Sequence, residues 1–150
     1  MQQKQWSIYL SGEIHSDWRE QIVSGCGEKR LPVAFSGPVT NHDASDMVGV
    51  NILGAEPQNF WRDRKGAAIN AIRSSALIGA ADVVVVRFGP KYKQWNAAFD
   101  AGYAAALGKP LVILHDEEHD HALKEVDAAA NATTRSPMQV VEILDYVIKG

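Results

Sequence analysis

Residues 82–88 read DVVVVRF, and this stretch decides the fold. Four consecutive valines show no alternation of apolar and polar side chains, which is typical of a strand covered on both faces in a parallel sheet. Apolar runs at 6–11 (WSIYLS), 31–36 (LPVAFS) and 110–115 (PLVILH) predict three further strands. We therefore expect a buried sheet at the centre of the protein.

Helical patterns separate these strands. Ser16 and Asp17 are typical of a helix start, and the glycines around Cys26 are typical of its end. Residues 37–49 (GPVTNHDASDMVG) predict an irregular polar loop. Strands alternating with helices predict one α/β domain over residues 1–150, with helices on both faces of the sheet. Further helices are expected over 62–80, within 94–110, over 119–130, and from the Ser136 cap with Pro137 in its first turn to about Lys149.

Composition narrows the class of protein. The 150-residue chain is long enough for one domain with a sizeable core. Its formal net charge of −3 lacks the basic excess of proteins that bind a nucleic acid polymer or an anionic membrane. Gly12, Glu13 and His15 interrupt the first apolar run, so we expect neither a signal peptide nor a membrane span. These features favour a cytoplasmic protein.

The binding site is expected at one edge of the sheet. In an open doubly wound sheet, ligands bind beyond the carboxyl ends of the strands, where the strand order reverses. The residues that follow each predicted strand are therefore the candidates. Gly12, Glu13 and His15 follow the first strand; His42, Asp43 and Asp46 follow the second; Phe88, Tyr92 and Trp95 follow the valine run and lead to Asn96 and Asp100.

Asp100 is the least expected of these residues, because it lies in a helix of alanine, glycine and aromatic side chains. It falls about one turn into the predicted helix, where the helix dipole and unpaired amide groups favour an ionised carboxylate. Phe99, Tyr103 and Ala106 are expected to enter the core, with Asp100 on a different face. Two interpretations stay open: a carboxylate that acts on a ligand, or one that only complements the helix dipole.

Three segments resemble, in the same order, the nucleoside 2-deoxyribosyltransferase superfamily: IYLSGEI at 8–14, ADVVVVRF at 81–88 and AAFDAGYAAALGKPLVIL at 97–114. Within that superfamily, WNAAFDAGYAAALGKP at 95–110 is most similar to the YtoQ group. The resemblance implies a single-domain, three-layer, flavodoxin-like fold with a five-stranded parallel sheet of order 2-1-3-4-5. It also implies a homo-oligomer, a dimer or larger, that needs no cofactor.

The resemblance further implies an activity. The family's catalytic glutamate falls on Asp100; in the family this carboxylate attacks the anomeric carbon and forms a glycosyl-enzyme, which water or an acceptor base resolves. We therefore expect cleavage or transfer of the N-glycosyl bond of a nucleoside-like substrate. A non-catalytic module that binds nucleosides or nucleotides in the same crevice is the alternative. With the strand-end positions, the substrate-binding candidates are Tyr9, Gly12, Glu13, His15, Arg19, His42, Asp43, Asp46, Phe88, Tyr92, Trp95 and Asn96.

The chain departs from the family pattern at three places. Asp100 replaces glutamate, so its carboxylate is on the order of 1 Å further from a sugar held in the usual position. Residues 96–97 (Asn-Ala) stand where the family often has Gly-Thr. Ser74 stands where relatives that hydrolyse deoxynucleoside monophosphates carry an acid, for which Asp43 or Asp46 could substitute.

Glu13 and the aromatic residues bear on the ligand. A carboxylate at position 13 would repel a phosphate unless Arg19 or Arg73 compensated, so we expect an unphosphorylated ligand whose sugar hydroxyls donate to Glu13. A solvated loop residue is the other interpretation of Glu13. Phe88, Tyr92 and Trp95 could stack on a nucleobase or pack in the core.

The segment HDEEHDH at 115–121 is rich in side chains that bind metals. His115, His119 or His121 could bind a metal ion together with the nearby acids. A solvated acidic loop before a helix is the favoured interpretation, so no metal site is expected.

Overall fold

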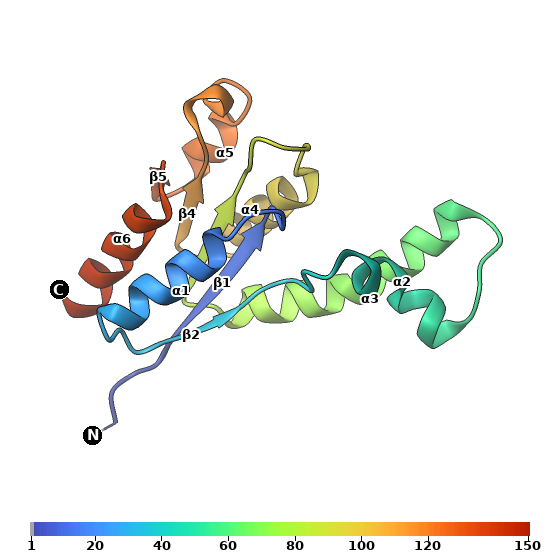
Figure 1. Ribbon diagram of the computed structural model, residues 1–150, viewed down its shortest axis with the longest axis horizontal. Helices are drawn as coiled ribbons and strands as arrows, with labels where there is room; N and C mark the ends of the chain where they lie inside the picture. The colour runs from blue at the N-terminus through green and yellow to red at the C-terminus, as the bar shows by residue number, and fades with distance from the viewer. Residues whose placement is uncertain (1) are drawn as a thin grey trace.

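The computed structural model describes residues 2–150 and contains a five-stranded parallel sheet of order β2-β1-β3-β4-β5 (Figure 1). This order confirms the α/β, flavodoxin-like fold predicted from the sequence. Four strands lie where the apolar runs predict them. The fifth has no such run, because it is a three-residue strand at the edge of the sheet. The strands are β1 (Trp6–Gly12), β2 (Val33–Ser36), β3 (Val83–Arg87), β4 (Leu111–Leu114) and β5 (Ala132–Thr134).

Helices cover both faces of the sheet. α1 and α6 pack side by side on one face, while the end of α3, α4 and α5 lie on the other (Figure 1). The first half of α3 pairs instead with α2, and the two form an arm that projects away from the sheet (Figure 1). The helices are α1 (Trp18–Glu28), α2 (His42–Leu53), α3 (Asn59–Ala80), α4 (Trp95–Ala106), the 3₁₀ turn η1 (Glu117–His119), α5 (Lys124–Ala129) and α6 (Pro137–Lys149).

The valine run lies at the centre of the sheet, with β1 on one side and β4 on the other. Val83 and Val85 enter the core beneath α1 and α6, whereas Val84 and Val86 enter the core beneath α3 and α4. All four side chains are buried. The prediction of a strand covered on both faces is therefore confirmed, and the packing explains why the run does not alternate.

The predicted loop over 37–49 is wrong in its second half, because α2 begins at His42. The Asn41 side chain caps this helix by accepting a hydrogen bond of 2.9 Å from the backbone N–H of Ala44. The polar residues that suggested a loop form the exposed first turn of this helix. The two helices of the arm approach closely at Gly49, where a Cβ atom would lie 2.7 Å from the backbone nitrogen of Gly66.

Two other helix starts show how local signals differ. Ser136 accepts a hydrogen bond of 3.3 Å from the backbone N–H of Gln139, so the predicted cap of α6 is confirmed. Ser16 does not cap α1, because Asp17 occupies the cap position and the Ser16 hydroxyl bonds to the Glu13 carboxylate. The helix expected over 119–130 is interrupted, with η1 and a turn before the short α5.

The buried face of α4 differs from the expectation. Phe99 is 73% exposed and Ala106 is also exposed, whereas Ala97, Ala101 and Ala104 are buried. Small side chains let the helix approach the sheet closely, and the larger ones therefore point outward. Among residues 2–150, no helix is both long enough and apolar enough to cross a membrane.

Candidate active site

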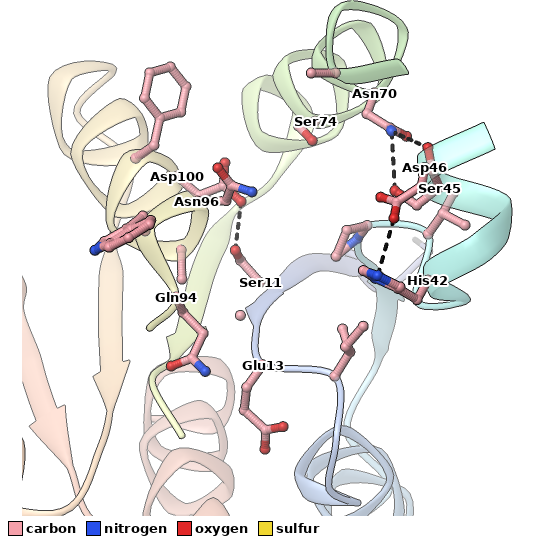
Figure 2. A pocket seen from close by; sticks show the side chains of 18 of the residues that line it. Ser11, Glu13, His42, Ser45, Asp46, Asn70, Ser74, Gln94, Asn96 and Asp100 are labelled. Carbon is pink, nitrogen blue, oxygen red and sulfur yellow. Dashed lines mark hydrogen bonds and ion pairs between the residues drawn. The ribbon is translucent and has the colours of Figure 1, made fainter. Parts of the chain in front are cut away.

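A cleft of about 770 Å³ opens at the carboxyl ends of β1 and β3. The strand order reverses between these strands, which is where doubly wound sheets bind ligands. The walls come from the loop after β1, the α2–α3 arm and the start of α4 (Figure 2). Of the predicted residues, Gly12, Glu13, His15, His42, Asp46, Tyr92, Trp95, Asn96 and Asp100 line the cleft. So do Arg73 and Ser74, both named in the sequence-based interpretation of the ligand, and Ser11, Asp63, Asn70 and Lys93, which no sequence pattern indicates.

Asp100 projects from α4 into this cleft and is partly buried (Figure 2). The hydroxyl of Ser11, at the end of β1, donates a hydrogen bond of 2.6 Å to its Oδ2 atom. Among residues 2–150, no group forms a hydrogen bond with the other oxygen, Oδ1. One oxygen is thus held by the protein, and the second is left for a ligand.

Burial controls the ionisation of Asp100. It raises the pKa of the carboxyl group above the ordinary value, and the Ser11 hydrogen bond offsets only part of this rise. Burial and the Ser11 contact, rather than the helix end, are thus the main influences on this carboxyl group. α4 does begin at Trp95, but Asp100 is its sixth residue and lies past the amide groups that lack partners within the helix.

Gly12 fixes the end of β1 against β3. Its φ angle is +121°, and a Cβ atom there would lie 2.1 Å from the carbonyl oxygen of Arg87. A residue with a side chain cannot take this position without moving the strand, so glycine sets the contact on which the cleft is built. The backbone N–H of Glu13 then donates a hydrogen bond of 3.2 Å to the same carbonyl group.

The Glu13 side chain turns away from the centre of the cleft (Figure 2). The residue is only 5% exposed, and its carboxylate accepts hydrogen bonds from the backbone N–H groups of His15 (2.6 Å) and Ser16 (3.2 Å) and from the Ser16 hydroxyl. Arg87 Nε adds an ion pair at 3.4 Å. Burial opposes ionisation, but these donors outweigh it and lower the pKa of Glu13. The carboxylate is therefore committed to the loop, which differs from the expected contact with sugar hydroxyls.

Four predicted residues do not line the cleft. Tyr9 and Phe88 are buried in the core between the sheet and α3 and α4. Arg19 donates to the backbone carbonyls of Leu10, Gly12 and Glu13, which holds the loop after β1 in place. Asp43 is exposed on α2 outside the cleft.

Aromatic side chains border the mouth of the cleft. The His15 and Tyr92 rings are 4.9 Å apart, centroid to centroid, and join the loops that follow β1 and β3. Tyr92 has a φ angle of +67°, a conformation that non-glycine residues adopt rarely and mostly where the surrounding structure requires it. Trp95 is 75% exposed at the first turn of α4. Tyr92 and Trp95, rather than Phe88, are thus placed to meet a flat ligand.

The histidine-rich segment forms a separate cluster. His115 is fully buried, not solvated as expected, and its Nε2 lies 2.8 Å from the carboxylate of Asp127. Atoms of His115, Asp120 and Asp127 lie within 4.8 Å of one another. The Arg135 guanidinium lies 2.7 Å from Asp120 and supplies the positive charge that these acids need. The buried histidine, the two acids and the arginine thus pair with one another.

The sequence of this chain matches one family over almost its whole length. The family described as nucleoside 2-deoxyribosyltransferase YtoQ matches residues 9–148. The chain belongs to this YtoQ family. A relative named "Uncharacterized protein YtoQ", from Bacillus subtilis (strain 168), is 45% identical over 142 residues, which cover 95% of this chain and 96% of the relative. The family membership predicted from the three sequence segments is thereby confirmed.

Solved structures share the fold of this YtoQ family member. The 2-deoxyribosyltransferase of the psychrotolerant bacterium Bacillus psychrosaccharolyticus matches with a TM-score of 0.54 and 15% identity over 90% of each chain. A conserved protein from Enterococcus faecalis V583 matches with a TM-score of 0.63 and 15% identity over 96% of this chain and 99% of the other. At such low identity these matches establish the fold alone.

Sequence reasoning missed two residues that organise the site. Ser11 bonds to Asp100 across 89 residues of sequence, and Arg87 bonds to Glu13 across 74. The Arg87 contact follows from the pairing of β1 with β3, which places residue 12 opposite residue 87, whereas the Ser11 contact follows from the packing of α4 against β1. The sequence does contain one signal for these contacts. Once β1 and β3 are taken as neighbours, the polar residues at their carboxyl ends are expected to lie close together.

Proposed function

We propose that this protein cleaves or transfers the N-glycosyl bond of a nucleoside-like substrate, with Asp100 as the nucleophile. The observation that carries the proposal is the state of the Asp100 carboxylate. Ser11 holds Oδ2, while Oδ1 has no protein partner within residues 2–150 and lies in a cleft large enough for a nucleoside. Membership of the YtoQ family supports the same reaction class.

The proposed reaction has two steps. Asp100 Oδ1 attacks the anomeric carbon of the sugar, and the bond from that carbon to the base breaks with its electron pair leaving on the base. Water or a second base then attacks the same carbon and releases Asp100. Tyr92 and Trp95 are proposed to contact the base, because both are exposed aromatic residues at the cleft mouth. Gly12 and His15, at and after the end of β1, and Asn96, in the first turn of α4, are proposed to contact the sugar.

A panel of ribonucleosides and 2′-deoxyribonucleosides tests the proposal. We expect free base to appear with the wild-type protein and to fall to the enzyme-free rate with Asp100→Asn. Glu142→Gln is the matched control, because Glu142 is an exposed acid on α6, on the opposite face of the sheet. Base release that survives in Asp100→Asn would remove Asp100 from the mechanism.

A non-catalytic nucleoside-binding module is the second candidate. The raised pKa of Asp100 favours it, because burial reduces the ionised share of the carboxylate that a nucleophile needs. Calorimetry with the same nucleosides separates the two functions. Binding without base release, unchanged in Asp100→Asn, supports the module and contradicts the enzyme.

We also propose that the protein is a homo-oligomer. The arm exposes large apolar side chains that a single copy does not cover, namely Ile52, Leu53, Phe60 and Trp61. We expect light scattering to give a mass of at least two chains, and Trp61→Glu to lower it. A wild-type monomer at micromolar concentration would contradict this proposal.

A further inference from the structure

The reaction proposed above needs a proton donor that Asp100 cannot supply. A nucleobase leaves poorly as an anion, so cleavage is faster when an acid protonates a ring nitrogen as the bond breaks. Asp100 is already assigned as the nucleophile. Ser74, at the position where some relatives carry an acid, has no acidic proton to give. Another group that lines the cleft must therefore act.

We propose that His42, oriented by Asp46, is the general acid that protonates the leaving base. The His42 Nε2 atom lies 3.1 Å from Asp46 Oδ2, one helical turn further along α2. Among residues 2–150, no group forms a hydrogen bond with the other ring nitrogen, Nδ1. A histidine paired with a carboxylate at one nitrogen and open at the other is the arrangement that general acids and bases use. This inference rests on the proposed function.

The surrounding contacts fix the turn of backbone that carries the pair. The Asn41 cap fixes the first turn of α2, from which His42 projects. The Asn70 side chain of α3 donates hydrogen bonds of 3.0 Å and 3.1 Å to the carbonyl and hydroxyl oxygens of Ser45, the residue before Asp46. The pair thus sits on a turn tied to both helices of the arm (Figure 2).

Its position suits a base rather than a sugar. His42 and Asp46 line the wall of the cleft formed by the arm, whereas Ser11 and Asp100 line the wall formed by β1 and α4 (Figure 2). A sugar whose anomeric carbon meets Asp100 can direct its base toward the arm. Three other groups of the cleft are less suitable: Glu13 is committed to its loop, His15 packs against Tyr92, and Asp63 lies 3.5 Å from the Arg62 guanidinium.

The proton balance is simple. Protonated His42 gives the Nδ1 proton to the base nitrogen as the bond to the anomeric carbon breaks, and the base leaves neutral. Neutral His42 then takes a proton from the water that attacks the glycosyl-enzyme. The sugar leaves with the oxygen of that water, and both residues return to their starting states.

The test compares nucleosides that need a proton with nucleosides that do not. A guanine methylated at N7 already carries a positive charge and leaves as a neutral base. We would measure base release from guanosine and 2′-deoxyguanosine and from their 7-methyl forms, each against an enzyme-free blank. The variants are His42→Ala, His42→Gln, Asp46→Asn, His15→Ala and Asp63→Asn. His42 is exposed, so its replacement should not unfold the protein, which circular dichroism would verify.

We expect His42→Ala and His42→Gln to lose about 10² to 10⁴-fold on the unmethylated nucleosides and to keep nearly wild-type rates on the 7-methyl forms. Asp46→Asn should show the same pattern with a smaller loss. Equal losses on both substrates would overturn the proposal, since His42 would then act in binding. If His15→Ala or Asp63→Asn instead loses activity on the unmethylated nucleosides alone, while His42→Ala keeps the wild-type rates, the proposal is overturned and the general acid is that other residue. If the wild type releases base from the 7-methyl forms alone, this result supports the nucleophile and contradicts the role of His42 as the acid. If the wild type releases base from no nucleoside, the proposed function itself is refuted.

Discussion

Glu13→Gln removes one buried negative charge and nearly preserves the size of the side chain. In the wild type the carboxylate accepts from two backbone N–H groups and the Ser16 hydroxyl and pairs with Arg87. The glutamine amide can accept at only one of its two ends, so its NH₂ group would face other donors. The Arg87 side chain, 13% exposed, would lose its only anionic partner among residues 2–150.

The expected cost follows from these contacts. A hydrogen bond to a charged group contributes about 1.5–3 kcal/mol, and removing one member of a buried ion pair costs about 3–5 kcal/mol. The Arg87 contact is long at 3.4 Å, which favours the lower end of the range. We therefore expect Glu13→Gln to lower the free energy of unfolding by about 3 kcal/mol and the melting temperature by about 6–12 °C.

Urea unfolding of both proteins, at pH 7 and at decreasing pH, measures this loss. The folded-state pKa of Glu13 is lowered from 4.5, so its stabilising contribution is complete above that pH and is lost as the pH falls through the folded value. The difference between wild type and variant should therefore be largest at pH 7 and shrink below pH 4.5. The control Glu142→Gln should change little. A loss below about 1 kcal/mol at pH 7, or one that persists unchanged in acid, would refute the reasoning.

Three further changes probe the cleft. Gly12→Ala should destabilise the fold by about 3 kcal/mol or more, because the new Cβ atom would clash with the Arg87 carbonyl and the φ angle is positive. Thermal melting curves measure this loss, and a variant as stable as wild type would contradict the close approach of β1 and β3 at Gly12. Ser11→Ala removes a hydrogen bond that lowers the pKa of Asp100, so the acid limb of the pH profile of kcat/KM should move to higher pH. Ser11→Thr keeps the hydroxyl and should restore the wild-type profile. An acid limb that does not move in Ser11→Ala would contradict this role of Ser11. Asp100→Asn should raise the free energy of unfolding at pH 7, because burial raises the folded-state pKa of the carboxyl group and so makes its ionised form unfavourable. This gain should vanish as the pH falls toward 3.8. A variant less stable than wild type at pH 7 would refute this prediction.

Much of the fold follows from local sequence patterns. The valine run predicts a strand buried on both faces because every second valine enters a different core. The Ser136 cap marks the start of α6 through a contact three residues away. The sequence pattern does not predict the start of α2, because the first turn of this helix is polar and exposed. Asn41 nevertheless caps α2 as Ser136 caps α6, through a contact with a backbone N–H three residues further on.

The candidate site is less accessible to sequence reasoning. Motifs identify the family and Asp100, but the partner of Asp100 lies 89 residues away and is set by the packing of α4 against β1. Glu13 shows the same limit, because its loop and Arg87 decide where the carboxylate points. Helix periodicity predicts Phe99 in the core on one face with Tyr103 and Ala106, whereas close packing of alanines against the sheet turns Phe99 outward. Such outcomes depend on tertiary contacts that local propensity does not contain.

Intact-protein mass spectrometry tests the role of Asp100 most directly. Wild-type protein mixed with a nucleoside and quenched in acid should gain the mass of one sugar residue, and peptide mapping should place it on residue 100. Asp100→Asn should gain nothing, while Glu142→Gln should gain the same mass as wild type. Base release without any sugar adduct in the wild type, or an adduct on another residue, would contradict the proposal that Asp100 is the nucleophile.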